Sequence, residues 1–359
     1  MDSPRNKVTG ILVAFAALMV IIAGLKASQA LLVPFLLAFF ISIICAGPFY
    51  WLRHRRVPAW LALLIVIVFV MFGGLLVLTI IGTSVNDFTS QLPVYEQQLR
   101  SQTLILIDWL DRFGIQISRQ LLFDHFDPGS IIQYTGRMLS AAGNVLTNSF
   151  LILLTVIFIL FEAAGMPNKL RAALNDADAS LDSYERFVKG VRKYLVIKTL
   201  ISLVTGLVVT AVLMIIGLDY AMLWGLIAFL LNYVPNIGSI IAAVPAVLLA
   251  LVQLGPLHAV LVAGFYAAIN VIMGNAVEPR LMGKSLGLST LVVFLSLVFW
   301  GWVLGPVGML LSVPLTMIMK IALEQNPSTR WLAIILGSDV SEQPPADHAD
   351  TEKAASGAA

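Results

Sequence analysis

The sequence has few charged residues and almost no cysteine. Of its 359 residues only 12% are charged, whereas 59% are hydrophobic. A soluble domain carries about a quarter charged residues, so this composition excludes an ordinary soluble protein. The single cysteine, Cys45, lies within an apolar run, which excludes both a disulfide framework and a thiolate metal site.

Sequence motifs of common enzyme classes are also missing. There is no HExxH, no Walker lysine loop and no GxSxG, and the four histidines are scattered along the chain. The net charge is +2, and no basic segment interleaved with aromatic residues occurs, so nucleic acid is not an expected partner. The sequence therefore predicts a protein that is not an enzyme and holds no cofactor and no metal ion.

Long apolar runs dominate the chain, and the mean hydropathy is +0.93. Runs of about 18 or more apolar residues are long enough to span a bilayer. We therefore predict an all-α polytopic integral membrane protein with about eight membrane segments in a lipid bilayer. Residues 1–83 form a three-helix membrane region, in which 8–25 is a retained helix rather than a signal peptide. By the positive-inside rule, the basic loop at 53–56 and the basic N-terminus are both expected in the cytoplasm.

The polar region at 84–145 separates this first part from a second membrane region. Phe88, Leu92, Tyr95 and Leu99 recur at three- and four-residue spacing, which predicts amphipathic helices in an excursion outside the membrane core. Residues 146–324 are predicted to form the transport core. The acidic tail, 325–359, has little to bury and is predicted to be flexible.

Two pairs of short apolar segments in the transport core are broken by helix-disrupting residues. Pro235-Asn236 separates the first pair and Gly305-Pro306 the second, and an intact helix at 257–277 lies between the pairs. A membrane anchor does not need such breaks, whereas a transporter uses them to free backbone groups for a polar solute. The pairs are either re-entrant hairpins or four short spans. The charge distribution does not distinguish these two topologies, because both leave Arg280 on the cytoplasmic side.

The first break is a candidate binding site. Pro235 removes a backbone donor, and Asn236 and Gly238 tolerate left-handed backbone, so the chain can unwind here. Carbonyl groups freed by this break, together with the amides of Asn232 and Asn236, suit a neutral hydroxylated ligand or a small cation. An ordinary interfacial turn is the alternative interpretation.

The end of the intact helix is a second candidate. Asn270, Gly274 and Glu278 are spaced by four residues and share one helical face, with Asn275 at its edge. Together with Arg280, Glu278 would form a gate pair or a proton site along the solute path. Alternatively, both charges lie at the headgroup level and only end the helix.

Two further charged residues flank apolar runs. Glu162 ends the fourth predicted span, at 146–164, and Lys198 begins the fifth, at 195–217. Long charged side chains near span ends can reach the interface. We expect both residues to do so without a role in transport.

Three stretches resemble the autoinducer-2 exporter (AI-2E) family of bacterial inner-membrane proteins. They are VPFLLAFFISII with the following RRVP, PNIGS in the first break, and NAVEPRLMGKSLGLSTLVVFLSLVFWGWVLGPVGMLLSVPLT. The resemblance covers nearly the whole chain, from about residue 8 to residue 324. It implies a permease in the inner membrane with a cytoplasmic N-terminus, assembled as a homo-oligomer such as a pentamer. It also implies export of a signalling molecule derived from a dihydroxypentanedione.

Three functions remain open on the sequence. The leading prediction is export of autoinducer-2 or a similar small hydroxylated solute, driven by an ion gradient or by facilitated diffusion, since no ATP-binding motif is present. Other members of the family resemble sodium/proton antiporters, so exchange of sodium or lithium for protons is the alternative. A membrane scaffold that binds a partner through 84–145 is the third possibility.

Overall fold

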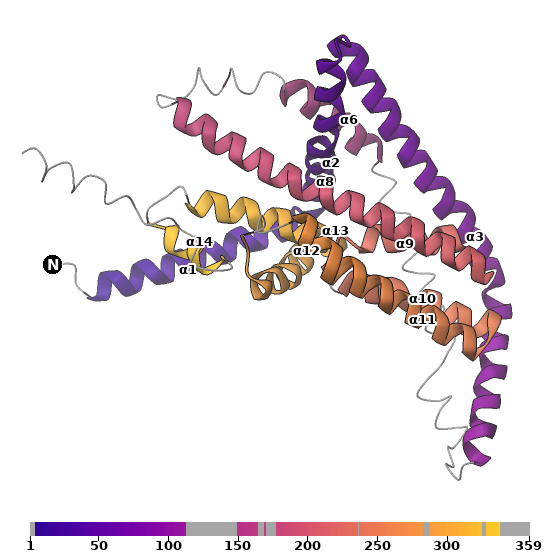
Figure 1. Ribbon diagram of the computed structural model, residues 1–359. Coiled ribbons are helices and arrows are strands. Elements are labelled where there is room, and N and C mark those ends of the chain that lie inside the picture. Colours follow the sequence, from indigo (N-terminus) through magenta and orange to yellow (C-terminus); the bar gives the residue numbers. More distant parts are fainter. Residues whose placement is uncertain are drawn as a thin grey trace, which may run out of the picture.

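The computed structural model describes residues 4–112, 149–163, 169, 177–235, 237–282, 287–324 and 328–337. Within these ranges the regular secondary structure is helical and no strand occurs (Figure 1), which confirms the predicted all-α class. The helices are α1 (Pro4–Ala27), α2 (Gln29–His54), α3 (Ala59–Arg112), α6 (Ser149–Ala163), α8 (Ala177–Ile216), α9 (Ala221–Leu231), α10 (Ile237–Leu254), α11 (Pro256–Asn270), the π-helix η1 (Val271–Val277), α12 (Glu278–Met282), α13 (Thr290–Glu324) and α14 (Arg330–Ile335).

Six helical stretches of the described chain are long and apolar enough to cross a membrane. They are Gln29–His54, Ala59–Phe88, Val188–Ile216, Ile237–Leu254, Pro256–Met282 and Thr290–Glu324. Three shorter apolar helices accompany them. This distribution agrees with a polytopic membrane protein that combines full spans with shorter segments.

The first broken segment forms a helical hairpin of α9 and α10. Its base is closed by Gln253 at the end of α10, whose Oε1 accepts the backbone N–H of Asp219 at 3.0 Å and whose Nε2 donates to Gly217 O at 3.2 Å. With 11 residues, α9 is about 16 Å long at about 1.5 Å per residue, too short for a hydrocarbon core of about 30 Å. The geometry of α9 therefore favours a re-entrant hairpin over two spans.

The tip of this hairpin packs without a left-handed glycine. The φ angle of Gly238 is not positive, but a Cβ on this residue would lie 1.8 Å from the carbonyl oxygen of Leu231. Glycine is needed here because the backbones approach closely, not because the chain needs the left-handed conformation expected from the sequence. The other predicted break residue, Asn236, lies outside the described residues.

The second broken segment, α13, bends sharply where predicted. Gly305 has φ 69° and ψ −156°, a conformation that glycine adopts without steric cost, and Pro306 follows it. Trp300 Nε1 donates to Thr316 Oγ1 at 3.1 Å, so the two arms fold against each other. The α13 hairpin packs with the first half of α8, around Leu195, whereas α9 and α10 pack with its second half, around Val209 (Figure 1).

Helix α3 continues well beyond its apolar part. Phe88 contacts Trp224 edge to face with ring centroids 6.3 Å apart, and Tyr95 Oη donates to Asp219 Oδ2 at 3.2 Å. Burial is the main cause that raises the pKa of the Tyr95 phenol, and Tyr220 and Asp219 raise it further, so this hydroxyl stays protonated and able to donate. These contacts attach the start of the predicted polar excursion to the membrane core. Whether 84–145 is a separate unit stays a prediction, since 113–148 lie outside the described residues.

Part of the predicted tail is helical. Helix α14 buries Ala333, and the backbone N–H of Ser289 donates to Leu336 O at 3.1 Å, so this segment packs beside the start of α13. Residues 338–359 lie outside the described part of the chain.

Helices α8 and α9 meet through two glycines. A Cβ on Gly225 would lie 1.8 Å from Thr210 Oγ1 and 2.6 Å from the carbonyl oxygen of Gly206, and both glycines are buried. Close approach of small residues is a main source of helix association in membranes, where apolar burial from water gives little. This contact holds the first arm of the α9–α10 hairpin against α8.

Replacing Gly225 by alanine is expected to separate α8 from α9. The added methyl group has no room next to the Thr210 hydroxyl and the Gly206 carbonyl oxygen, so we expect overpacking to cost about 1–3 kcal/mol. The measurement is the apparent melting temperature of the purified protein in detergent. Gly264→Ala is the matched control, because nothing lies within 4 Å of a Cβ at that position of α11. Equal melting temperatures for the two variants would contradict the role given to this contact.

Candidate functional site

A stripe of polar side chains lies along one face of α8. Lys198, Ser202 and Thr205 are spaced by four and three residues, which places them on one helical face. Their side chains are only 2%, 0% and 6% exposed, so this face is turned into the protein. All three lie within Val188–Ile216, one of the helical stretches long and apolar enough to cross a membrane. We call these three residues the α8 stripe, and polar residues so deep in an apolar helix indicate a functional site.

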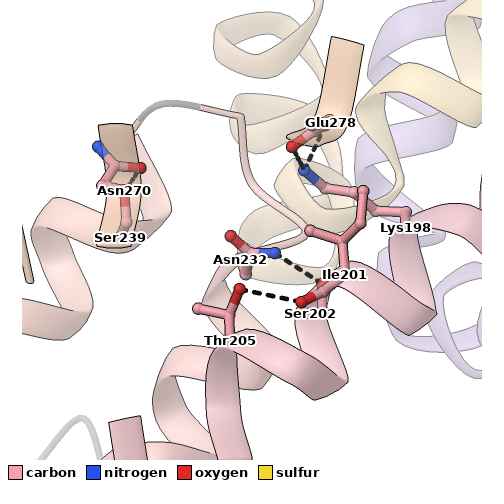
Figure 2. A network of polar contacts seen from close by, with 8 residues as sticks. All are labelled: Lys198, Ile201, Ser202, Thr205, Asn232, Ser239, Asn270 and Glu278. Carbon is pink, nitrogen blue, oxygen red and sulfur yellow. Dashed lines mark hydrogen bonds and ion pairs between the residues drawn. The ribbon is translucent and has the colours of Figure 1, made fainter. Parts of the chain in front are cut away.

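An ion pair joins the α8 stripe to the end of the intact helix. Lys198 Nζ donates to both carboxylate oxygens of Glu278, at 2.7 and 2.8 Å (Figure 2). The Lys198 side chain is buried within the protein. The expectation that Lys198 reaches the interface is wrong, because Glu278 holds its ammonium group in the interior. Glu278 therefore lies beside α8, against Lys198.

The tip of the α9–α10 hairpin also bonds to α8. Asn232 Nδ2 donates to Ser202 Oγ at 2.9 Å, and Tyr233 Oη donates to Thr199 Oγ1 at 2.7 Å. Figure 2 shows the oxygen of the Asn232 amide pointing away from Ser202, towards the side where Ser239 and Asn270 lie. The predicted break thus places its polar groups against hydroxyl groups of α8.

A π-helix interrupts the predicted intact helix between Asn270 and Glu278, beside the contacts just described. Asn270 ends α11 and accepts the hydroxyl of Ser239 at 2.7 Å, and the seven residues of η1 then lead to Glu278. The wider turn of a π-helix changes the direction in which the following side chains point, and such segments are frequent at functional sites. Asn270 therefore contacts α10 while Glu278 contacts α8, although the sequence spacing predicts one common face.

A cavity lies between α8, α9, α10 and α11. Its empty volume, including part of the mouth, is about 290 Å³. The polar lining residues are Thr205, Asn232, Ser239, Asn270 and Tyr266, and the remaining lining is apolar. Neutral amides and hydroxyls of this kind can both donate to and accept from a hydroxylated solute. Among the described residues no cluster of three or more His, Cys, Asp or Glu side chains could hold a metal ion.

Comparison with known proteins places this architecture in a family. The model of the AI-2E family transporter matches residues 12–328. The chain belongs to the AI-2E transporter family. It is 41% identical over 333 residues to the AI-2 transport protein TqsA of Escherichia coli K12, covering 93% of this chain and 96% of the relative.

Two further relatives, both named putative transport proteins, are similar over nearly their whole length. A relative from Haemophilus influenzae is 42% identical over 332 residues, which covers 91% of this chain and 95% of the relative. The protein YhhT of Escherichia coli K12 is 38% identical over 339 residues, which covers 94% of this chain and 97% of the relative. The family resemblance predicted from the sequence is confirmed.

Several predicted site residues of this AI-2E protein lie together, and others do not. Asn232, Asn270 and Glu278 contribute to the polar contacts of Figure 2, and Pro235 lies half-buried at the hairpin tip. By contrast, the side chains of Asn275 and Arg280 are exposed.

The second break of the AI-2E chain has other neighbours. A Cβ on Gly305 would lie 2.8 Å from Gln29 Nε2, and the exposed Trp302 ring packs 4.0 Å from Lys26 Nζ. Gly305 and Pro306 thus lie beside α1 and α2, and neither lines the cavity.

Sequence reasoning missed Ser202, Thr205, Tyr233 and Tyr266 as site residues, and it assigned Lys198 to the interface. The spacing of Lys198, Ser202 and Thr205 within one apolar run was a usable signal, because three polar residues on one face predict a helix side turned to protein or water. Nothing in the sequence marks Tyr266, whose position in the cavity depends on how α11 packs.

Removing one partner of the ion pair should destabilise the AI-2E fold more than removing both. Lys198→Met leaves the Glu278 carboxylate without its partner, and breaking a buried pair costs about 3–5 kcal/mol. The double variant Lys198→Met/Glu278→Gln leaves no unpaired charge, so its apparent melting temperature should lie nearer to the wild type. The control is Lys169→Met, since both side chains of the Lys169–Glu162 pair are exposed and such a pair is worth about 0–1 kcal/mol. If the losses of melting temperature in Lys198→Met and Glu278→Gln simply add up in the double variant, the ion pair does not contribute as described.

Proposed function

We propose that this AI-2E protein exports autoinducer-2, or a similar small hydroxylated signalling solute, across the bacterial inner membrane. The observation that carries the proposal is the buried polar constellation at the middle of α8, where a broken hairpin and a π-helix meet a neutral cavity. Interrupted helices in the membrane expose polar groups to solutes in transporters. The 41% identity to a relative named AI-2 transport protein supports this solute and a role in quorum sensing.

We further propose that the Lys198–Glu278 pair couples transport to an ion gradient. Protonation of Glu278 would remove the negative charge that holds the Lys198 ammonium in the interior, and an unpaired charge is costly there. A proton taken up by this carboxylate would therefore favour a rearrangement of α12 relative to α8.

The same contacts disfavour sodium or lithium binding at Glu278. A hard cation needs several oxygen ligands, and both carboxylate oxygens of Glu278 already accept from Lys198. A cytoplasmic N-terminus and assembly as a homo-oligomer such as a pentamer remain part of the proposal and follow from the basic clusters and from the family resemblance.

The function is tested by uptake of labelled autoinducer-2 into inside-out proteoliposomes holding the purified protein. We expect accumulation when a proton gradient is imposed and less or none without it. Equilibration that ignores the gradient would exclude coupling and indicate a facilitator. Absence of autoinducer-2 flux, together with proton movement on addition of sodium, would replace the proposal by an antiporter.

Glu278→Gln should abolish the dependence of flux on the gradient. Glutamine has nearly the shape of the protonated acid but cannot release a proton, so accumulation should fall at least tenfold while membrane insertion persists. Glu162→Gln is the control, because that carboxylate is exposed and pairs with Lys169. Gradient-driven accumulation by a well-inserted Glu278→Gln protein would remove this carboxylate from the mechanism.

A further inference from the structure

We propose that the turn between α2 and α3 is a binding site for the phosphate group of an anionic phospholipid, with Arg53, Arg55 and Arg56 as its contact residues. The turn joins two helical stretches that are long and apolar enough to cross a membrane, Gln29–His54 and Ala59–Phe88, so it lies at one surface of the bilayer. The proposed site shares no residue with the polar contacts of Figure 2, and it goes beyond the function proposed above.

The positive charge of this turn has no acidic counterpart. Residues 3–86 contain six lysines and arginines but neither aspartate nor glutamate. The three arginines of the turn are exposed, and within the described part of the chain none of them forms an ion pair. In Figure 1 the turn lies at an outer end of the molecule, away from the other described helices. An anionic partner for these side chains would therefore come from outside the described chain.

Arg56 occupies a backbone position at which glycine is usual. The end of α2 is a Schellman motif, in which the backbone N–H of Val57 donates to Leu52 O at 3.2 Å. The second bond of the motif runs from the N–H of Arg56 to Arg53 O at 3.0 Å. Arg56 has φ 64°, a left-handed conformation that is less favourable for arginine than for glycine. Arginine at this position costs stability and keeps a positive charge, and such local strain is typical of functional positions.

Two tryptophans favour a lipid over a free anion. Trp51 and Trp60 lie on either side of the turn and are 57% and 67% exposed, and tryptophan prefers the headgroup level of a bilayer. The guanidinium group of Arg55 lies 4.7 Å from the centre of the Trp51 ring, which holds its charge at that level. Guanidinium groups bind phosphate oxygens through paired hydrogen bonds. An anionic phospholipid offers such a phosphate where the tryptophans already lie.

The test compares Arg56→Gly with Arg56→Gln in the full-length protein, purified in detergent and titrated with dioctanoyl phosphatidylglycerol. The readout is the apparent melting temperature, which a ligand of the folded state raises. Both variants lose one positive charge, so the lipid concentration that gives half of the maximal rise should increase about fivefold in each. Without lipid, only Arg56→Gly should melt at a higher temperature than the wild type, because only glycine relieves the left-handed conformation.

The matched control is Arg330→Gln. Arg330 is an exposed arginine at the start of α14, which lies away from the turn in Figure 1, so this variant should need the same lipid concentration as the wild type. Two further ligands separate the lipid from its parts. Dioctanoyl phosphatidylcholine has the phosphate but no net charge, and sn-glycerol 3-phosphate has the charge but no acyl chains. Neither should raise the melting temperature of the wild type comparably, and an equal rise with glycerol phosphate would replace the lipid by a free anion.

Two results with the variants would overturn the proposal. Equal half-maximal concentrations for the wild type and Arg56→Gln would show that the charge does not contribute to lipid binding. A lower melting temperature of Arg56→Gln without lipid would show that the guanidinium group already has a partner inside the protein, such as an acidic segment of the chain. Autoinducer-2 enters none of these measurements, so failure of the proposed transport function would leave the lipid site standing.

Discussion

The ion pair between Lys198 and Glu278 joins α8 to α12 inside the helical assembly. Each charge alone would be costly at this depth of an apolar helix, so α8 and α12 are held in one relative position by mutual neutralisation. The relative position of the two side chains is closely restrained, because one ammonium group donates to both carboxylate oxygens, at 2.7 and 2.8 Å. The hairpin tip contacts the same face of α8 through Asn232, and the π-helix leads into Glu278. Both elements therefore lie next to the ion pair.

The backbone breaks follow from the same constraint. A helix interrupted inside a membrane leaves polar groups that lipid cannot satisfy, so a break survives only where protein covers it. The α9–α10 tip meets this requirement through Asn232 and Tyr233, which bond to hydroxyls of α8. The α13 bend meets it differently, with glycine geometry at Gly305 and a Trp300–Thr316 bond between its arms. One break is therefore polar and lines the site, whereas the other organises packing with α1 and α2.

The sequence predicted the class, the breaks and the amide-bearing segment, because proline, glycine and apolar length act locally. It did not predict which charges pair, since Lys198 and Glu278 lie far apart in the chain and meet only through helix packing. The shared face of Asn270 and Glu278 was a deduction from regular α-helical spacing, and the π-helix between them changes that spacing. Gly238 was correctly marked as special, but its role is close backbone approach to Leu231, a property that spacing alone does not reveal.

The neutral cavity and the ion pair lie next to each other, and α8 connects them physically. Ser202 holds the Asn232 amide that lines the cavity, and Lys198, one turn earlier on the same rigid helix, holds Glu278. Adjacent turns of one helix move together, so these two contacts are mechanically linked. In the proposed mechanism, neutral solute chemistry and proton chemistry would need no common side chain. A change in the charge of Glu278 would reach the cavity through the position of α8 against the hairpin tip.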